Sequence, residues 1–443
     1  MTDFSKIKTV HFIGIGGIGT SAIARMFALE GNPSTGLGVK KVSGSDMAES
    51  EVTNALKETG VTIFIGEDAK NVPPDCDLVM YTIAISDEHA ELVEAKKRGI
   101  PVISYPEALG IISKDKYTIA ITGTHGKTTT TAMVAKILID AGLDPTVIIG
   151  SFLFDADGKR TNFVAGKSKY LVVEGCEYCR SFLNLSPSIL VITNIDADHL
   201  DYYHDMQDII SAFVELSQKL PKDGYLLVDS HAPNLEAVVK QSPCQNGDFE
   251  VLKLPEGFKL HIPGAHNLLN AKAALGVAKI LGISEERALT SLSEFRGTWR
   301  RFEYRGKAKN GALVYDDYGH HPTEIEATLR GTRELFPAQK IVVVFQPHLY
   351  SRTKQHLEGF GSAFTEASSV MLLPIYPARE EDPGDISSQM VVDEIKKKGK
   401  DAHLVSTFDD AAKLAEECSG AGDIIITLGA GDTNKVADIL VRQ

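Results

Sequence analysis

A glycine–lysine–threonine sequence at residues 126–128 is the part of this chain best suited to chemistry. It lies in Ile121-Thr-Gly-Thr-His-Gly-Lys-Thr-Thr-Thr130. A glycine-bearing turn between a strand and a helix points backbone N–H groups at an anion, and the helix dipole adds to the attraction. Lys127 can reach the β- and γ-phosphates of a nucleotide, and the Thr128 hydroxyl can bind Mg²⁺. We expect Lys127 to be an exposed loop side chain that matters little for stability.

The flanking segments have the periodicity that such a turn requires. Residues 117–122 are partly β-branched and predict a strand, and residues 128–141 carry apolar side chains at helical spacing. The full Walker pattern has a glycine six residues before the lysine, where this chain has Ile121, so the turn is a P-loop variant. The alternative is a turn that binds no ligand, but the sequence then indicates no other function for Lys127. The predicted nucleotide-binding turn comprises Gly123, Thr124, His125, Gly126, Lys127, Thr128 and Thr129.

A second glycine-rich turn follows the first predicted strand, at Gly14-Ile-Gly-Gly-Ile-Gly19. Gly14, Gly16, Gly17 and Gly19 fit a nucleotide-binding βαβ unit, in which a pyrophosphate approaches the helix N-terminus. The ribose-binding acid of a dinucleotide site lies ~20 residues further on. Here the first suitable acid is Asp46, 27 residues after Gly19, and the excess lies in the loop at residues 31–38. The pattern therefore indicates a nucleotide diphosphate and does not indicate nicotinamide; the alternative is a turn used only for tight packing.

Polar residues also follow two predicted strands of the central part of the chain. Glu174 ends the strand at 169–174, and His199 follows the strand at 188–194. In open parallel sheets ligands gather at the carboxyl ends of the strands, so both residues should lie near the P-loop and could bind Mg²⁺. The alternative is a capping acid and a surface histidine. Cys176 and Cys179 form a lone C-x-x-C pair, which we interpret as two semi-buried thiols and not as a metal or redox site.

Two further groups complete the candidate residues. Asn267 and Asn270 lie one helical turn apart and could hydrogen-bond a base or ribose, although helix capping is an equal alternative. In Asp316-Asp-Tyr-Gly-His-His-Pro-Thr-Glu324, adjacent aspartates and histidines could bind a metal. We favour a surface for substrate and nucleotide there.

Composition is ordinary for a soluble globular protein, and the length suggests about three domains. It has 443 residues, 43% of them apolar, and a net charge of −13, which argues against a nucleic-acid or anionic membrane partner. No apolar run approaches the ~18 residues of a membrane span. The first residues hold no apolar signal core, and five cysteines suggest a reducing compartment, so we expect a cytoplasmic protein. Strand–helix alternation predicts α/β domains at 1–112, 113–299 and 300–443. In the last of these, strands are predicted at 313–315, 341–345, 370–376 and 424–428.

Five motifs, taken in order along essentially the whole chain, resemble those of the Mur ligase family. They are Gly-Thr-His-Gly-Lys-Thr-Thr-Thr from Gly123, Thr-Asn-Ile-x-x-Asp-His-x-Asp from Thr193, His-Asn-x-x-Asn from His266, Arg-Arg-Phe-Glu from Arg300, and Asp-Asp-Tyr-Gly-His-His-Pro-Thr-Glu from Asp316. The resemblance implies a Rossmann-like UDP-sugar domain, a central P-loop ATPase-like domain with a parallel sheet, and a C-terminal Rossmann-like domain. The first glycine turn, Ser43-Gly-Ser-Asp46 and the Asp316 block are most similar to the members that join L-alanine to UDP-N-acetylmuramate.

The resemblance also implies a reaction. ATP phosphorylates the lactyl carboxylate of UDP-N-acetylmuramate, and the amine of L-alanine attacks the acyl phosphate, with Mg²⁺ as cofactor. Lys127 then holds the γ-phosphate, Thr128 binds one Mg²⁺, and Glu174 and His199 bind a second.

The remaining assignments are carried over in the same way. Asn267 and Asn270 match the adenine-side pair, and Arg301 and Asp317 match residues that close on ATP phosphate and ribose. Gly14, Gly16, Gly17, Gly19, Asp46, His320, His348 and Arg352 are expected to contact the substrates. We expect a monomer or a weak homodimer.

Three departures from the family pattern leave alternatives open. Cys176 and Cys179 replace two acids near the second metal, Leu349 replaces an arginine that could grip the amino-acid carboxylate, and the loop at 31–38 is long. The acceptor could accordingly be a murein peptide.

Two other classes of protein are alternatives. In a nicotinamide-dependent oxidoreductase, Lys127 and the P-loop would have no function. A nucleotide-binding scaffold without catalytic activity would not need Lys127, Glu174, His199 and Asp317 together.

Overall fold

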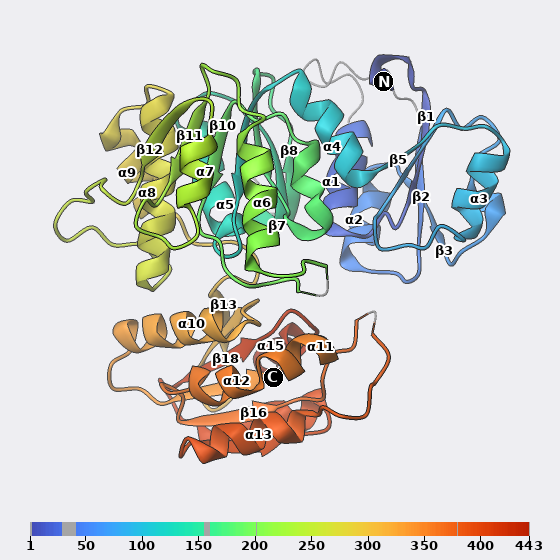
Figure 1. Ribbon diagram of the computed structural model, residues 1–443. Coiled ribbons are helices and arrows are strands. Elements are labelled where there is room, and N and C mark those ends of the chain that lie inside the picture. The colour runs from blue at the N-terminus through green and yellow to red at the C-terminus, as the bar shows by residue number, and fades with distance from the viewer. Residues whose placement is uncertain (1, 29–40, 155–159, 201, 379, 443) are drawn as a thin grey trace. The chain divides into compact units, whose positions relative to one another are not determined.

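Three sheets, each largely parallel, organise the chain (Figure 1). The computed structural model describes residues 2–28, 41–154, 160–200, 202–378 and 380–442. The loop predicted at 31–38 lies outside these residues. Strands and helices alternate throughout, so the predicted α/β class with three parallel-sheet domains is confirmed. None of the helices within the described ranges combines the length and apolarity that a membrane crossing requires.

The first sheet has the strand order β3-β2-β1-β4-β5, with all its pairings parallel. Its central strand β1 is buried along its whole length, and α1 covers it with Ile23 and Phe27. The first glycine turn lies between these two elements. The bounds are η1 Phe4–Lys6, β1 Thr9–Ile13, α1 Ile18–Ala28, β2 Lys41–Asp46, α2 Glu51–Glu58, β3 Thr62–Ile65, η2 Ala69–Asn71, β4 Leu78–Tyr81, α3 Ala90–Lys97, β5 Val102–Ser104 and α4 Tyr105–Lys114.

The second sheet has the order β12-β11-β10-β6-β9-β7-β8, in which only the β7–β8 pair is antiparallel among the described pairings. The P-loop strand β6 therefore lies between β9 and β10. The bounds are β6 Tyr117–Thr122, α5 Lys127–Asp140, β7 Thr146–Phe154, β8 Arg160–Val164, β9 Tyr170–Glu174, η3 Tyr178–Asn184, β10 Ile189–Ile192, α6 Met206–Ser217, β11 Tyr225–Val228, α7 Glu236–Gln241, β12 Gln245–Asp248, α8 Ala265–Ile280 and α9 Glu285–Ser293.

The third sheet has the order β13-β14-β18-β15-β16-β17, with β13 antiparallel to β14. One of its faces packs on α10, α12 and α13, and the other packs on α14 and α15. The bounds are β13 Glu303–Lys307, β14 Leu313–Asp317, α10 Pro322–Leu335, β15 Ile341–Phe345, α11 Tyr350–Gln355, α12 Leu357–Ala363, β16 Ser369–Leu372, α13 Ser388–Lys397, β17 Asp401–Leu404, α14 Phe408–Cys418, β18 Ile424–Leu428 and α15 Asn434–Val441.

The first two sheets belong to one compact unit, Met1–Phe258 with Asn270–Ser293, and the third belongs to a second unit, Lys259–Leu269 with Glu294–Gln443. A single apolar cluster runs through the cores of both sheets in the first unit. Asn162 on β8 donates a hydrogen bond of 2.7 Å to the Ser21 hydroxyl on α1, which ties the two sheets together. The predicted boundaries near residues 112 and 299 remain predictions.

Two predicted strand ends were wrong. The strand expected at 313–315 continues through Asp317, because both aspartates pair in register with β18. The strand expected at 370–376 is the shorter Ser369–Leu372. The strands predicted at 117–122, 341–345 and 424–428 are confirmed.

A buried arginine holds the second unit together. The side chain of Arg300 is almost fully buried, and its Nε donates to Asp316 Oδ2 at 2.9 Å. Its Nη1 donates to the Gly431 carbonyl at 2.8 Å, and its Nη2 donates to the Thr433 hydroxyl at 2.9 Å. Arg300 thus joins the end of β14 to the loop that follows β18.

Replacing Arg300 with leucine is expected to lower the free energy of unfolding by about 3–5 kcal/mol, because Asp316 is left as a buried, unpaired carboxylate. Arg330→Leu is the matched control. The side chain of Arg330 is 57% exposed with its Nη1 3.9 Å from Glu326 Oε1, and losing such a surface pair costs no more than about 1 kcal/mol. Urea unfolding of both variants measures the difference, and equal losses would contradict the role given to Arg300.

Candidate active site

The P-loop turn connects β6 to α5 through two glycines in conformations that other residues rarely adopt. Gly123 has a φ of +128° and Gly126 a φ of +82°. A Cβ atom on Gly126 would lie 2.5 Å from Asn270 Oδ1, and one on Gly123 would lie 2.1 Å from the Thr193 hydroxyl. Gly126 is the N-cap of α5 and, as a glycine, has no side chain with which to cap this helix. Its first backbone N–H groups therefore point out of the helix end, where an anion can accept from them.

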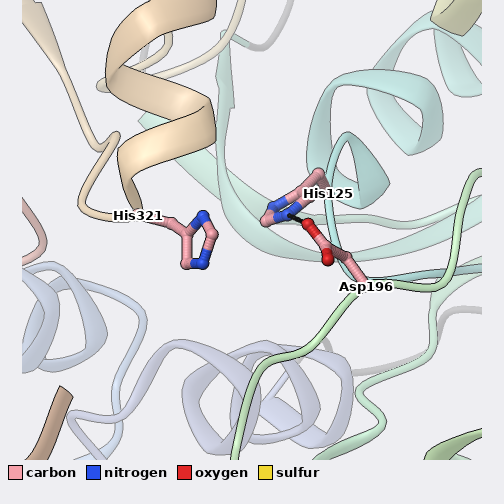
Figure 2. Close-up of side chains that lie close together, drawn as sticks. All are labelled: His125, Asp196 and His321. Carbon is pink, nitrogen blue, oxygen red and sulfur yellow. Dashed lines mark hydrogen bonds and ion pairs between the residues drawn. The ribbon is translucent and has the colours of Figure 1, made fainter. Parts of the chain in front are cut away.

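The loop after β10 fixes the shape of this turn. Asn194 Oδ1 accepts from the His125 backbone N–H at 2.9 Å, and the Asn194 carbonyl accepts from the Thr124 N–H at 3.1 Å. The Thr193 hydroxyl donates to the His125 carbonyl at 2.6 Å. Figure 2 shows the ring of His125 paired with Asp196, with Nε2 3.1 Å from Oδ2. The sequence did not identify Asn194 and Asp196 as site residues, although Asn194 ends a predicted strand and Asp196 closely follows it.

Lys127 is the first residue of α5, and its side chain is only 15% exposed. The expectation of an exposed loop lysine was therefore wrong. Its Nζ lies 3.0 Å from Glu177 Oε1 and donates to the carbonyls of Gly123 at 2.6 Å and Thr124 at 3.0 Å. Burial by itself lowers the pKa of Lys127, but nearby negative groups, Glu177 foremost, hold it above its usual value. Lys127 thus remains a cation in this site.

Thr128 and Glu174 lie together beside the lysine. The Thr128 hydroxyl donates to Glu174 Oε1 at 3.0 Å, and the Gly150 N–H donates to Oε2 at 2.9 Å. Because β9 pairs with β6, Glu174 lies opposite Ile121, next to the P-loop turn. This is the position predicted from the end of its strand. A hydroxyl and a carboxylate are oxygen donors of the kind that Mg²⁺ prefers, so this pair fits such an ion.

His199 approaches from the strand on the other side of β6. Its Nε2 lies 3.8 Å from Glu177 Oε1, and its ring centre lies 4.9 Å from that of Tyr178. The backbone φ of His199 is +56°, which reflects the tight turn after β10. The structure thus brings Lys127 and His199 to the same carboxylate, Glu177.

Cys176 and Cys179 are both exposed residues, so the expectation of a semi-buried pair was wrong. Both lie in the turn after β9, in which Cys179 and Arg180 have φ values of +51° and +53°. Arg180 anchors the turn by donating to Asp208 Oδ1 at 2.6 Å.

The first glycine turn has Asp46 beside it. Asp46 Oδ2 accepts from the Gly16 N–H at 2.8 Å, so this carboxylate shapes the turn itself. At its other end the ring of Tyr105, the first residue of α4, packs against Gly19, where an added Cβ would lie 2.5 Å from a ring carbon. Gly14 has a φ of +73°, and Gly17 donates its N–H to the Gly14 carbonyl at 3.2 Å. The sequence gave no signal for Tyr105.

The two predicted adenine-side asparagines lie in the first turns of α8 and are buried. Asn267 Nδ2 donates to the Pro263 carbonyl at 2.6 Å. Asn270 lies against Gly126, which places an amide at the P-loop of the first unit.

The second unit brings its own predicted residues together. Asp317 is buried; its Oδ2 accepts from the Phe302 N–H and its Oδ1 from the Gly319 N–H, both at 2.8 Å. Burial raises the pKa of Asp317, although the charge of Arg301 opposes this. These bonds hold the carboxylate against its own backbone, and a nucleotide contact by Asp317 remains a prediction.

His348, His320 and Arg352 also lie close together in this unit, around the ring of His348. Its ring stacks on Tyr376 at 5.6 Å between centres, and the His320 ring lies 6.0 Å away. Arg352 Nη1 lies 3.4 Å from His348 Nδ1. Leu349 is buried and has a φ of +67°, so its side chain packs in the core of this unit.

Three family models match this chain one after another. The one described as the Mur ligase family catalytic domain matches residues 9–117, the Mur ligase middle domain matches 121–252, and the Mur ligase glutamate ligase domain matches 300–431. The chain belongs to the Mur ligase family. The resemblance drawn from the five motifs is confirmed.

Individual relatives are similar to this Mur ligase over their full lengths. A Clostridium kluyveri protein named UDP-N-acetylmuramate–L-alanine ligase is 41% identical over 467 aligned positions, which cover 100% of this chain and 99% of that protein. The crystal structure of UDP-N-acetylmuramate-alanine ligase MurC from Thermotoga maritima is 30% identical, with a TM-score of 0.80 and 98% of each chain covered. A murein peptide ligase from Psychrobacter arcticus has a TM-score of 0.71 and 98% of each chain covered; at 23% identity it shows the shared fold alone.

Replacing Gly126 with alanine is expected to weaken ATP binding at least about tenfold, a change of ~1.4 kcal/mol. The left-handed conformation costs an alanine roughly 1–2 kcal/mol, and the new methyl group displaces Asn270. Gly142→Ala is the matched control, because Gly142 has a φ of +75° with open space around its Cβ position. Calorimetric ATP titration should show normal affinity for the control; equal weakening in both variants would contradict the site.

Proposed function

We propose that this chain is an ATP-dependent ligase that joins L-alanine to UDP-N-acetylmuramate in the synthesis of peptidoglycan precursors. The observation that carries the proposal is the largely buried Lys127 at a helix N-terminus whose N-cap is a glycine, with Thr128 and Glu174 3.0 Å apart beside it. Full-length similarity to proteins named UDP-N-acetylmuramate–L-alanine ligase supports this choice of substrates.

In the proposed reaction a lactyl carboxylate oxygen attacks the γ-phosphorus of ATP, and ADP leaves. The amine nitrogen of L-alanine then attacks the acyl carbon, inorganic phosphate leaves, and the nitrogen loses a proton to give the amide. Phosphoryl transfer of this kind depends on positioning and on cations more than on covalent help. Lys127 and the N–H groups of α5 supply positive charge around the phosphates, and His125 is held by Asn194 and Asp196 so that the turn keeps its shape.

Thr128, Glu174 and His199 would hold Mg²⁺, which supplies charge neutralisation to the phosphates when bound. The donor set of a hydroxyl, a carboxylate and an imidazole fits this use. Asn270 beside Gly126 is placed to contact the nucleotide, and Asn267, Arg301 and Asp317 are assigned to it by motif. We assign the UDP-sugar to the turn of Gly14–Gly19 and the amino acid to His320, His348 and Arg352.

A second candidate function is ligation of a murein peptide instead of L-alanine. Leu349 favours it, because this leucine stands where an arginine could hold a free amino-acid carboxylate, and its side chain is buried. Arg352 still offers a guanidinium next to His348, so we favour L-alanine. With a net charge of −13, we assign no nucleic-acid or membrane partner, and we propose a cytoplasmic monomer or weak homodimer.

ADP release should require ATP, Mg²⁺, UDP-N-acetylmuramate and an amino acid together. When the amino acid is omitted and hydroxylamine is added, a hydroxamate should form, because the acyl phosphate reacts with this nucleophile. A coupled ADP assay and mass spectrometry of the UDP-sugar measure both outcomes. ADP formed at the same rate without the UDP-sugar would reject the ligase reaction.

L-Alanine should be the best acceptor, with glycine and L-serine weaker. A pocket separates substrates that differ by one small group by only ~1–3 kcal/mol, so both should react about 10–200 times more slowly. Comparison of kcat/KM for the twenty amino acids and a murein tripeptide tests this. If only the tripeptide reacts, the second candidate function replaces the first.

A further inference from the structure

The carboxylate of Glu177 is the most deeply buried acid near the P-loop, and neither the motifs nor the proposed reaction uses it. Its side chain is 3% exposed, and it lies 3.0 Å from Lys127 Nζ and 3.8 Å from His199 Nε2. Its backbone carbonyl accepts from the Tyr203 hydroxyl at 2.6 Å, and Tyr203 is fully buried. The position of Glu177 is therefore fixed from both ends.

The two acids of this segment have separate partners. Glu174 accepts hydrogen bonds from the Thr128 hydroxyl and the Gly150 N–H, whereas Glu177 accepts one from the Lys127 ammonium group. The two acids therefore have different roles in the site. Glu177 is the acid through which the P-loop lysine is held.

Counting hydrogen-bond donors shows what this pairing implies for phosphate binding. A lysine ammonium has three N–H donors. In this structure the partners of Lys127 Nζ are the carbonyls of Gly123 and Thr124 and the carboxylate of Glu177. A phosphate oxygen can contact Lys127 only in exchange for one of them. Glu177 is the charged competitor, and two negative groups close together repel strongly at a buried site.

We propose that Glu177 is a positioning residue that exchanges with the terminal phosphate of the nucleotide on Lys127. The inference rests on the proposed function, because it requires ATP at the P-loop. Glu177 pairs with Lys127 before the nucleotide binds. The terminal phosphate then displaces Glu177 from the ammonium group, and the Lys127–Glu177 pair forms again when the phosphate leaves. His199, 3.8 Å away, is the nearest other partner of the released carboxylate.

This exchange gives Glu177→Gln a signature that general damage to the site does not produce. ATP should bind about tenfold more tightly, because the competing negative charge is gone; this corresponds to ~1.4 kcal/mol. The kcat should fall about tenfold or more, because nothing recaptures Lys127 as the products leave, so KM and kcat decrease together. Glu177→Asp, which keeps the charge, should restore the affinity of the unchanged protein.

The matched control is Asp198→Asn. Asp198 lies 3.9 Å from His199, as near as Glu177, but does not contact Lys127. Its loss of charge should change ATP affinity less than about threefold. In a Lys127→Met background, Glu177→Gln should leave ATP affinity unchanged, because the exchange acts through the lysine.

The experiment is calorimetric titration of the full-length variants with ATP, in the absence of UDP-sugar and amino acid, followed by steady-state kinetics. Tighter binding in Glu177→Gln alone, abolished by Lys127→Met, supports the inference. Unchanged or weaker binding in Glu177→Gln overturns it and leaves the ligase function intact, whereas no ATP binding by the unchanged protein rejects both. If Glu177→Gln does not fold, the double variant with Lys127→Met should fold, because the unpaired buried lysine is gone; failure of the double variant also overturns the inference.

Discussion

A buried positive charge at the start of α5 is the constraint on which the first unit depends. Removing an ammonium group from water is expensive unless a counter-charge and hydrogen-bond acceptors surround it. The chain supplies both, with the carboxylate of Glu177 and the carbonyls of Gly123 and Thr124. The strand order β10-β6-β9 makes this arrangement possible, because it places the segments after β9 and β10 on either side of the lysine.

The glycines and the polar loop residues also help to stabilise the buried ammonium group of Lys127. A turn that points two carbonyls at Lys127 and its N–H groups outward requires left-handed backbone angles at Gly123 and Gly126. Such a turn would be loosely held by itself. Asn194 fixes it with both its side chain and its carbonyl, so the shape of the phosphate site is set before any ligand arrives. Preorganisation of this kind is what phosphoryl transfer demands of a protein.

The fold was predictable where the signal is local. The runs at 341–345 and 424–428 are continuous and largely β-branched, as buried parallel strands are, and both were found as predicted. The strand through Asp317 was underestimated because its last two residues are charged. Asp316 is nevertheless accommodated in the sheet, because Arg300, 16 residues earlier, pairs with it.

The site was predictable in outline and not in its contacts. Strand ends correctly brought Glu174 to the P-loop, since sheet order alone determines that proximity. The burial of Lys127 was missed, because the carboxylate that pairs with it, Glu177, lies 50 residues away in the sequence. Nothing local to either residue signals that pair. The exposure of Cys176 and Cys179 was also missed, because it depends on the path of the turn after β9, where Cys179 and Arg180 have positive φ values that the sequence does not indicate.

In the proposed reaction, phosphate passes at this P-loop from ATP to a carboxylate, which then becomes an amide. The most direct measurement uses UDP-N-acetylmuramate labelled with ¹⁸O in its lactyl carboxylate, turned over with ATP and L-alanine. The carboxylate oxygen that attacks phosphorus must leave with it, so mass spectrometry should find one ¹⁸O atom in the released inorganic phosphate. Phosphate without the label, formed together with the amide, would contradict the account.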